Sequence, residues 1–180
     1  MKKKIMNEIE IPEGVEVTIE GNTAVVKGKE GEVKKKFNIN KLVFEKKDNK
    51  ITIGNENATK NEKKRINTIS AHLKNMIKGV QEKFEYLLKV VSTHFPMSIE
   101  LKGNSAVVKN FLGEKIPREV KILDGVEVSI DKDIIKITSN NKESAGQTAA
   151  NFEKTTKIRL KDRRIFQDGI FITNKSGREI

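Results

Sequence analysis

The sequence predicts an α+β protein made of two tandem copies of one small domain, each a small antiparallel sheet packed on one main helix. The first observation is an internal repeat: residues 21–27 read GNTAVVK and residues 103–109 read GNSAVVK, six of seven identical at an offset of 82. The second is the order of patterns, because strand patterns precede one helical pattern in each copy, without the βαβ alternation of parallel sheets. We therefore expect domains at residues 1–83 and 84–180.

The first copy is organised by alternating and helical patterns of apolar residues. Alternation, typical of a strand with one buried face, occurs at Val15, Val17 and Ile19 and again at Ile51 and Ile53. Gly21-Asn22 lies beside the first pattern, where a tight hairpin turn needs residues that tolerate positive φ. A helix is expected from about Thr59 to Val80, because apolar residues recur there at three- and four-residue steps. This stripe comprises Ile66, Ile69, Leu73, Met76 or Ile77, and Val80.

The second copy repeats the same order of patterns. Phe84–Val90 alternates as a strand, Gly103-Asn104 repeats the turn, and Gly113-Glu114 matches Gly31-Glu32 at the offset of 82. Further strand patterns contain Ile99 and Leu101, and Ile135 and Ile137. A second helix is expected from about Lys142 to Thr156, with Asn141 as its N-cap. The inward-facing residues of this helix are Ala145, Ala149 and Phe152.

The charge composition points to a polyanionic partner. The 180 residues include 36 Lys and Arg against 25 Asp and Glu, a formal net charge of +11, and the chain has no cysteine. Disulfides and thiolate metal sites are therefore excluded. No apolar run approaches the roughly 18 residues of a membrane span, and the N-terminus has no signal-peptide core, so we expect an intracellular protein with no membrane partner. Nucleic acid is the first candidate ligand and an anionic membrane surface the second, although the sequence has no basic amphipathic helix with Trp or Phe on its apolar face. A solvated lysine-rich surface is the alternative to both.

The sequence offers no catalytic constellation. Its two histidines, His72 and His94, lie in different elements without an obvious carboxylate partner, and each is expected to be structural or solvent-facing. Asp131 and Asp133 flank a turn without the further carboxylates of a two-metal site. Gly113-Glu114-Lys115 does not fit a phosphate-binding P-loop. We therefore expect no enzyme activity, no metal, no cofactor and no small-molecule substrate.

The kind of basic residue differs between the copies. Both are net positive, but of the six arginines only Arg65 precedes residue 96. Arginine can engage a phosphate through two parallel hydrogen bonds, whereas lysine acts as a mobile point charge. The densest basic segment is residues 154–164, with six Lys and Arg opposed only by Asp162. This segment predicts a surface that binds the phosphates of structured RNA. The alternative is a solvent-exposed strand edge whose charges prevent it from pairing with another chain.

Several longer motifs resemble one known family. AHLKNMIKGV at 71–80, FEYLLKVV at 84–91, HFPMS at 94–98 and FLGEKIPRE at 111–119 are similar to the archaeal and eukaryotic branch of the large-subunit ribosomal protein six family. GQTAANFEKTTKI at 146–158 and DRRIFQDGIFI at 162–172 resemble the C-terminal signature of the same family. The resemblance covers essentially the whole chain, in order and without large gaps.

This resemblance implies a structural constituent of the large ribosomal subunit, located with the ribosome in the cytoplasm. It implies binding to large-subunit ribosomal RNA near the stalk base and the sarcin–ricin loop, beside neighbouring ribosomal proteins at the stalk base and with translational GTPases nearby. The C-terminal domain is expected to make most of the RNA contact. The expected RNA-binding residues are Lys115, Arg118, Lys154, Lys157, Arg159, Lys161, Arg163, Arg164 and Arg178.

The resemblance also assigns roles near the C-terminus. Phe166 and Phe171 are expected in the core, and Gly169 is expected to serve the backbone through a turn or a close approach. Arg178 lies in a short polar tail that could follow the RNA and be disordered alone.

Two other classes of function remain open at this point. The chain could be a protein-interaction module in which an open sheet face, most naturally on the first domain, docks a partner such as a stalk protein. It could also be an RNA-processing enzyme, which metal-dependent cleavage abolished by a single carboxylate substitution would reveal.

The arginine distribution generates a first prediction. Arg163→Ala combined with Arg164→Ala should weaken binding to ribosomal RNA more than Lys34→Ala combined with Lys35→Ala, because the phosphate contacts are expected in the second copy. Filter binding with each double variant measures the difference. Equal losses from both pairs would contradict a dominant C-terminal surface.

Overall fold

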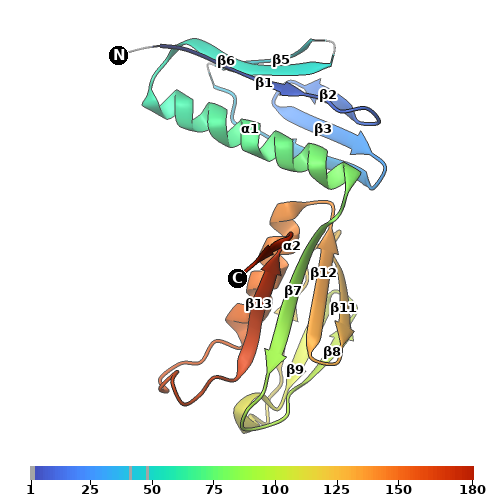
Figure 1. Ribbon diagram of the computed structural model, residues 1–180, viewed down its shortest axis with the longest axis vertical. Helices are drawn as coiled ribbons and strands as arrows, with labels where there is room; N and C mark the ends of the chain where they lie inside the picture. The colour runs from blue at the N-terminus through green and yellow to red at the C-terminus, as the bar shows by residue number, and fades with distance from the viewer. Residues whose placement is uncertain (1–2, 41, 48) are drawn as a thin grey trace. The chain divides into compact units, whose positions relative to one another are not determined.

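The chain forms two compact units, each with its own apolar core. The computed structural model describes residues 3–40, 42–47 and 49–180. The first unit ends at Lys83 and the second begins at Phe84 (Figure 1). Each unit contains antiparallel strands and one long helix, which confirms the predicted α+β class, although the strands of each unit divide into two sheets. Across the described residues, neither helix has the length and apolar character to cross a membrane.

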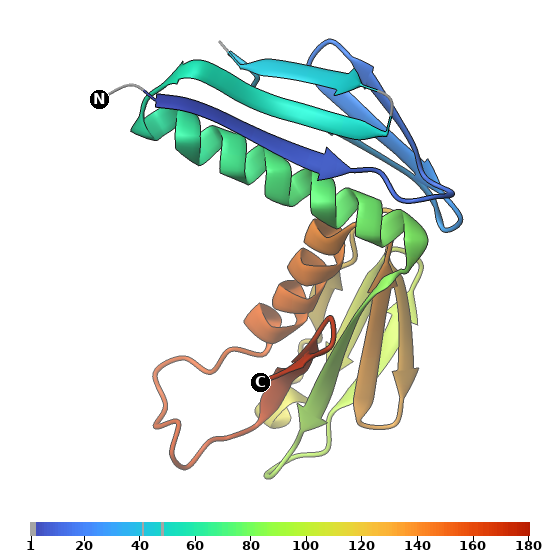
Figure 2. The same cartoon turned by 45° about the horizontal axis from the view of Figure 1, so that its top comes forward.

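The first unit has two three-stranded antiparallel sheets beside its helix (Figure 2). One sheet has the order β1-β6-β5, with β1 at Lys3–Glu10, β6 at Lys50–Ala58 and β5 at Val43–Lys47. The other has the order β2-β3-β4, with β2 at Glu16–Glu20, β3 at Thr23–Gly28 and β4 at Gly31–Lys36. Gly21 has a φ of 57° in the turn between β2 and β3, as the sequence predicts.

Helix α1 spans Lys60–Gln81 and packs against both sheets of the first unit. It begins with a capping box in which the side chain of Glu62 accepts a hydrogen bond from the backbone N–H of Thr59, and this satisfies a backbone donor that the helix leaves unpaired. The predicted apolar stripe is buried in full, and Ile66, Leu73 and Val80 are each 0% exposed. The core of this unit therefore lies between α1 and the inner faces of the sheets.

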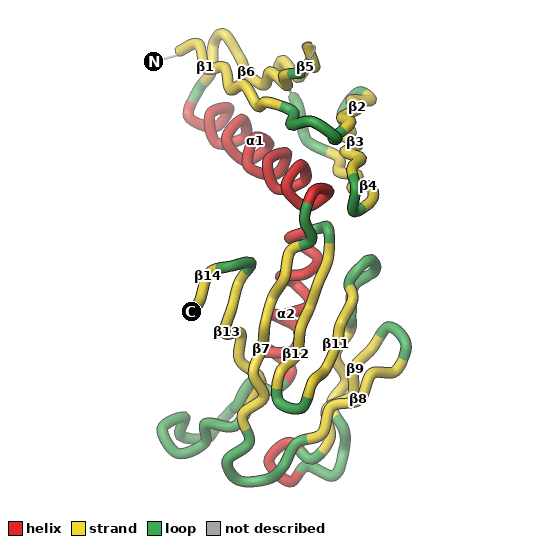
Figure 3. Tube along the Cα trace, turned by 45° about the vertical axis from the view of Figure 1, so that its right-hand side comes forward, coloured by secondary structure: helices red, strands yellow, loops and turns green. Residues whose placement is uncertain are grey.

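The second unit repeats this arrangement and extends one sheet (Figure 3). The larger sheet has the order β11-β12-β7-β13-β14, with β11 at Glu127–Asp131, β12 at Ile134–Ser139, β7 at Phe84–Val91, β13 at Gly169–Lys175 and β14 at Arg178–Glu179. The smaller has the order β10-β9-β8, with β10 at Arg118–Lys121, β9 at Ser105–Lys109 and β8 at Ser98–Lys102. Strand β7 corresponds to β1, and β13 pairs along its other edge.

Helix α2 spans Lys142–Thr155 and is capped by Asn141, whose side chain accepts a hydrogen bond from the backbone N–H of Glu143 at 3.0 Å. Its buried residues are Ala145, Thr148, Ala149 and Phe152. They have the same spacing as Ile66, Ile69, Ser70 and Leu73 of α1, at an offset of 79. The last residue of α2, Thr155, aligns with Met76 at this offset, whereas α1 continues for five more residues, to Gln81.

The strand registers show that the second copy contains three extra residues after the repeated hairpin. Val26 pairs with Val33 in the first unit, and its equivalent Val108 pairs with Arg118 in the second. Val33 therefore corresponds to Arg118, an offset of 85 in place of the 82 between Val26 and Val108.

The predicted match between Gly31-Glu32 and Gly113-Glu114 is consequently wrong as a structural equivalence. Gly31 pairs with Gly28 across the β3–β4 turn, whereas Gly113 ends the short 3-10 helix η1 at Phe111–Gly113. The identical letters occupy different positions because the inserted residues form a loop that the first unit lacks.

Core packing in the second unit generates a stability prediction. Phe152 is 0% exposed, and Phe152→Ala should lower the free energy of unfolding by about 3–5 kcal/mol through lost apolar burial and the remaining cavity. Tyr86 is the single tyrosine, the chain has no tryptophan, and Tyr86 is buried in the second unit. Tyrosine fluorescence during urea unfolding therefore measures this unit. Glu153→Ala is the control, because Glu153 is exposed and should change stability by about 0.5 kcal/mol or less.

Candidate nucleic-acid interface

The segment between α2 and β13, residues 156–168, carries most of the predicted RNA-binding residues and is drawn as a long loop in Figure 3. A buried hydroxyl fixes its first residue. Thr156 is 3% exposed, and its Oγ1 accepts a hydrogen bond from the backbone N–H of Ile170 at 2.9 Å. The start of the loop is thereby tied to the start of β13.

A buried carboxylate fixes the other end of the loop. Asp168 is 1% exposed, and its Oδ1 accepts hydrogen bonds from the backbone N–H groups of Thr93 at 2.6 Å and His94 at 2.9 Å. Its Oδ2 lies 2.6 Å from Nδ1 of His94. Burial alone would raise the pKa of Asp168, but the hydrogen bonds from His94 and Thr93 together bring it below its ordinary value. His94 therefore has the carboxylate partner that the sequence did not reveal.

His94 in turn holds an aromatic ring of the loop. The rings of His94 and Phe166 are stacked with centroids 4.9 Å apart. The ammonium of Lys161 lies 4.5 Å from the centroid of the Phe166 ring, a cation–π contact. One buried carboxylate thus orders a chain of contacts that reaches a predicted RNA-binding lysine.

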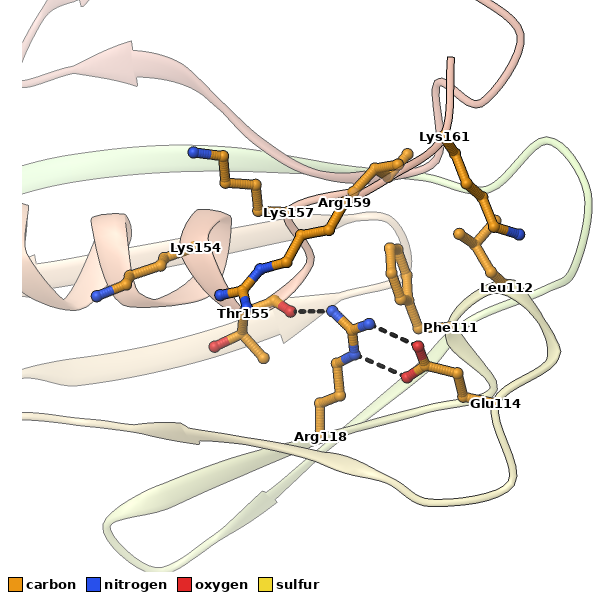
Figure 4. A pocket seen from close by; sticks show the side chains of 10 residues that line it. Phe111, Leu112, Glu114, Arg118, Lys154, Thr155, Lys157, Arg159 and Lys161 are labelled. Atoms are coloured by element: carbon orange, nitrogen blue, oxygen red, sulfur yellow. Dashed lines mark hydrogen bonds and ion pairs between the residues drawn. The ribbon is translucent and has the colours of Figure 1, made fainter. Parts of the chain in front are cut away.

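Arg118 joins the inserted loop to the end of α2 (Figure 4). Its Nε and Nη2 donate to the two carboxylate oxygens of Glu114 at 2.7 and 2.5 Å, and its Nη1 donates to the carbonyl oxygen of Thr155 at 2.5 Å. Its guanidinium also lies 4.4 Å from the centroid of the Phe111 ring. Hydrogen bonding from Arg118 lowers the pKa of Glu114, so the carboxylate stays charged and the pair is a bidentate clamp.

Two hollows lie beside the segment from Lys154 to Arg159. The first, of about 470 Å³, lies between this segment and the inserted loop, as Figure 4 shows. The second, of about 1070 Å³, lies between the same segment and residues of β13, including Phe171. Lys154, Lys157 and Arg159 line both hollows. A ligand in either hollow would therefore meet the same three cations.

The first hollow exists because two differences between the copies coincide. In the first unit, a Cβ added to Gly28 would lie 2.8 Å from the side chain of Val80, so the end of α1 closes directly against the β3–β4 turn. In the second unit, α2 ends earlier and the three-residue insertion displaces the corresponding turn. The space that α1 fills in one copy is open in the other.

The structure brings together most of the predicted RNA-binding residues. Arg118, Lys154, Lys157, Arg159 and Lys161 line the first hollow, and Arg163 lines the second. Lys115 lies exposed in the inserted loop without lining either one. Arg164 is exposed, but its guanidinium binds the carboxylate of Asp162 at 2.8 Å. Arg178 lies in β14, which pairs with β13, so the expectation of a tail that is disordered alone is wrong.

The aromatic and glycine assignments had mixed outcomes. Phe171 is 43% exposed, so its expected place in the core is wrong. Phe166 is half-buried under His94. Gly169 has a φ of 154°, and an added Cβ would lie 3.2 Å from the ring of Phe171, which confirms the expected backbone role.

Comparison with known proteins gives the family. The family model described as ribosomal protein L6 matches residues 11–83 and 95–169. The chain belongs to the ribosomal protein L6 family. It is 41% identical over 174 residues to the large ribosomal subunit protein uL6 of Methanococcus vannielii, covering 97% of this chain and 96% of that protein. It is 43% identical over 171 residues to the uL6 protein of Methanobrevibacter smithii, covering 95% and 96% of the two chains.

Membership of the L6 family confirms the resemblance noted in the sequence. It also confirms two expectations, that the protein is not an enzyme and that it is located with the ribosome in the cytoplasm. The family consists of structural ribosomal proteins and not of enzymes, and it is cytoplasmic with the ribosome. The two matched segments of the family model also agree with the duplication inferred from the repeat. No cluster of three or more potential metal-ligating side chains occurs among the residues that the structure describes.

The buried carboxylate generates a pH-dependent prediction. The contribution of Asp168 to folding should be fully present above the unfolded pKa of about 3.9 and lost as the pH falls through the lower folded pKa. Asp168→Asn should therefore destabilise the second unit by about 1–3 kcal/mol near neutral pH and by much less near about pH 2.5. Urea unfolding followed by tyrosine fluorescence measures both values.

Asp133→Asn is the matched control, since Asp133 is exposed and its replacement should shift neither value appreciably. A cost of Asp168→Asn that is the same at both pH values would contradict a stabilising role for the carboxylate charge.

Proposed function

We propose that the second unit of this L6-family protein binds large-subunit ribosomal RNA through the surface around residues 154–164. The observation that carries the proposal is the placement of Lys154, Lys157 and Arg159 between two adjacent hollows. The role is architectural: charge and shape hold folded RNA, and no chemical step follows. The family membership supports a structural place in the large ribosomal subunit, with ribosomal RNA and other ribosomal proteins as partners.

The charges at this surface are not equally available to phosphates. Lys154, Lys157, Arg159 and Arg163 make no side-chain hydrogen bond or ion pair with any residue that the structure describes. Arg118 and Arg164 already engage Glu114 and Asp162. A protein cation that neutralises a phosphate displaces a counterion condensed on the RNA. The release of these counterions supplies much of the affinity for RNA. We therefore assign phosphate contact to the first four residues and positioning to Arg118.

The proposed mode of recognition is backbone and shape, with little stacking on bases. Phe166 is already in contact with His94 and Lys161, and Phe171, at the start of β13 beside the loop, is an exposed ring. Structured RNA is commonly recognised through its phosphates and the shape of its grooves. The fixed ends of the loop at Thr156 and Asp168 keep the cations in place before RNA arrives.

The proposed position in the subunit is near the stalk base and the sarcin–ricin loop, where the protein would support the translation-factor site. Neighbouring stalk-base proteins and translational GTPases would then be close to the second unit. The similarity of this chain to uL6 proteins of archaea supports a position in the large ribosomal subunit, and the placement near the stalk base is the finer part of the proposal. In this proposal, the second unit is the main RNA-binding half of the chain.

RNA binding through this surface should depend steeply on salt. The logarithm of the affinity for large-subunit ribosomal RNA should fall linearly with the logarithm of salt concentration between about 50 and 200 mM. Lys157→Gln combined with Arg159→Gln should weaken binding and reduce the magnitude of the slope by about 1–2 units, because each neutralised phosphate contributes about 0.9. Filter binding across a salt series measures both quantities.

The control is Lys102→Gln combined with Lys121→Gln, which removes the same charge from exposed positions of the same unit away from both hollows. An affinity of the wild type that is insensitive to salt would refute the proposed function.

A further inference from the structure

A third hollow, of about 500 Å³, lies in the first unit between the end of β4 and the N-terminal half of α1. Phe37 and Ile69, each 5% exposed, contribute its apolar base. Its rim is polar and basic. The hollow is lined by Lys35, Lys36, Phe37, Asn38, Asn61, Lys64, Arg65, Thr68, Ile69 and His72, without an acidic side chain.

Three basic side chains of this hollow lack carboxylate partners of the kind that neutralise lysines elsewhere in the first unit. Lys34 and Lys27 lie 2.9 and 3.5 Å from carboxylate oxygens of Glu32. In contrast, Lys36, Lys64 and Arg65 make no side-chain hydrogen bond or ion pair with any described residue. Three adjacent uncompensated cations raise the local positive potential, which attracts an anion.

Lys35 and His72 also line the hollow, and they contact each other. The ammonium of Lys35 lies 3.2 Å from Nδ1 of His72. The imidazole is in addition packed against Phe37, with ring centroids 6.2 Å apart. The lining of the hollow therefore includes this Lys35–His72 contact, between β4 and α1, beside its three uncompensated cations.

At the equivalent place the second unit keeps only one of these basic residues, because Lys121 corresponds to Lys36. Phe37 and Ile122 are equivalent, since their backbone N–H groups donate to the carbonyls of Asn22 and Asn104. On the helix, the offset of 79 aligns Lys64, Arg65 and His72 with Glu143, Ser144 and Asn151. Asn151 instead donates to the carbonyl oxygen of Lys121 at 3.0 Å. Since the second copy folds with other residues at the positions of Lys64, Arg65 and His72, these three side chains are not required for folding.

We propose that this hollow of the first unit, lined by Lys36, Lys64 and Arg65 with Lys35 and His72, binds phosphates of an RNA backbone. The inference rests on the proposed binding to ribosomal RNA and adds a second contact on the other unit. A protein partner fits less well, because protein interfaces centre on exposed apolar anchors. None of the exposed large hydrophobic residues lies in the lining. The two copies would thus contact RNA through different ends of the same helix-and-strand scaffold.

The first test uses the full chain and purified large-subunit ribosomal RNA freed of protein. The triple variant Lys36→Gln, Lys64→Gln and Arg65→Gln should reduce the magnitude of the salt slope by about 2–3 units, at about 0.9 per phosphate. The matched variant Lys29→Gln, Lys60→Gln and Lys74→Gln removes the same charge from exposed positions of the first unit outside the hollow. It should leave the slope nearly unchanged, and circular dichroism should show both variants folded.

The outcomes separate this inference from the proposed function. If the wild type binds ribosomal RNA and both triple variants have the same slope, the hollow is not a phosphate site and the inference alone fails. If the wild type itself does not bind in a salt-dependent manner, the proposed function fails.

A second test identifies the class of ligand. The chain has no cysteine, so Thr68→Cys places a single photocrosslinker in the lining of the hollow. In reconstituted large subunits it should crosslink to RNA. Crosslinks exclusively to protein would overturn the proposal in favour of an acidic protein partner.

Discussion

The end of helix α2 is the constraint on which the candidate RNA surface depends. Thr156 ties the chain to Ile170 immediately after the helix, and the carbonyl of Thr155 accepts a hydrogen bond from Arg118. If α2 continued as α1 does, its last turns would occupy the hollow between the inserted loop and residues 154–159. Ending the helix five residues early puts a loop that carries cations where α1 has buried helical positions. The buried carboxylate of Asp168 then fixes the far end of that loop, at the cost of its own desolvation, which three hydrogen bonds offset.

Duplication supplied one scaffold, and divergence placed positive charge at different ends of its helix. In the second copy the cations follow the helix C-terminus, beside the inserted loop. In the first copy they lie on the N-terminal half of α1 and the adjoining strand, while the C-terminal turn closes against Gly28. The cores remained similar, because the buried positions of the two helices keep the same spacing. Packing constrains that spacing, whereas exposed positions are free to change charge.

The sequence was sufficient to predict which segment forms the candidate site. It was not sufficient to predict the contacts that the individual residues of the site make. The density of Lys and Arg at residues 154–164 was sufficient to locate it, since charge on an exposed loop changes little with tertiary context. The role of Arg118 was not predictable, because its partner Thr155 lies 37 residues away. Nor was that of Asp168, whose donors Thr93 and His94 come from 75 and 74 residues earlier. The resemblance implied a core position for Phe171, yet its ring lines the larger hollow and is partly exposed there.

By itself, the sequence determined the duplication, the α+β class, the helices with their buried stripes, and the basic character of the second copy. These features depend on local periodicity and composition, which neighbouring residues along the chain specify. Only the tertiary structure decided that Gly31 and Gly113 are not equivalent and which cations remain unpaired. It also decided that α2 ends before the helical turn with which α1 packs against Gly28. Those outcomes depend on strand register and on contacts between residues far apart in sequence, and a register is set by the packing of the whole sheet and not by any one segment of it.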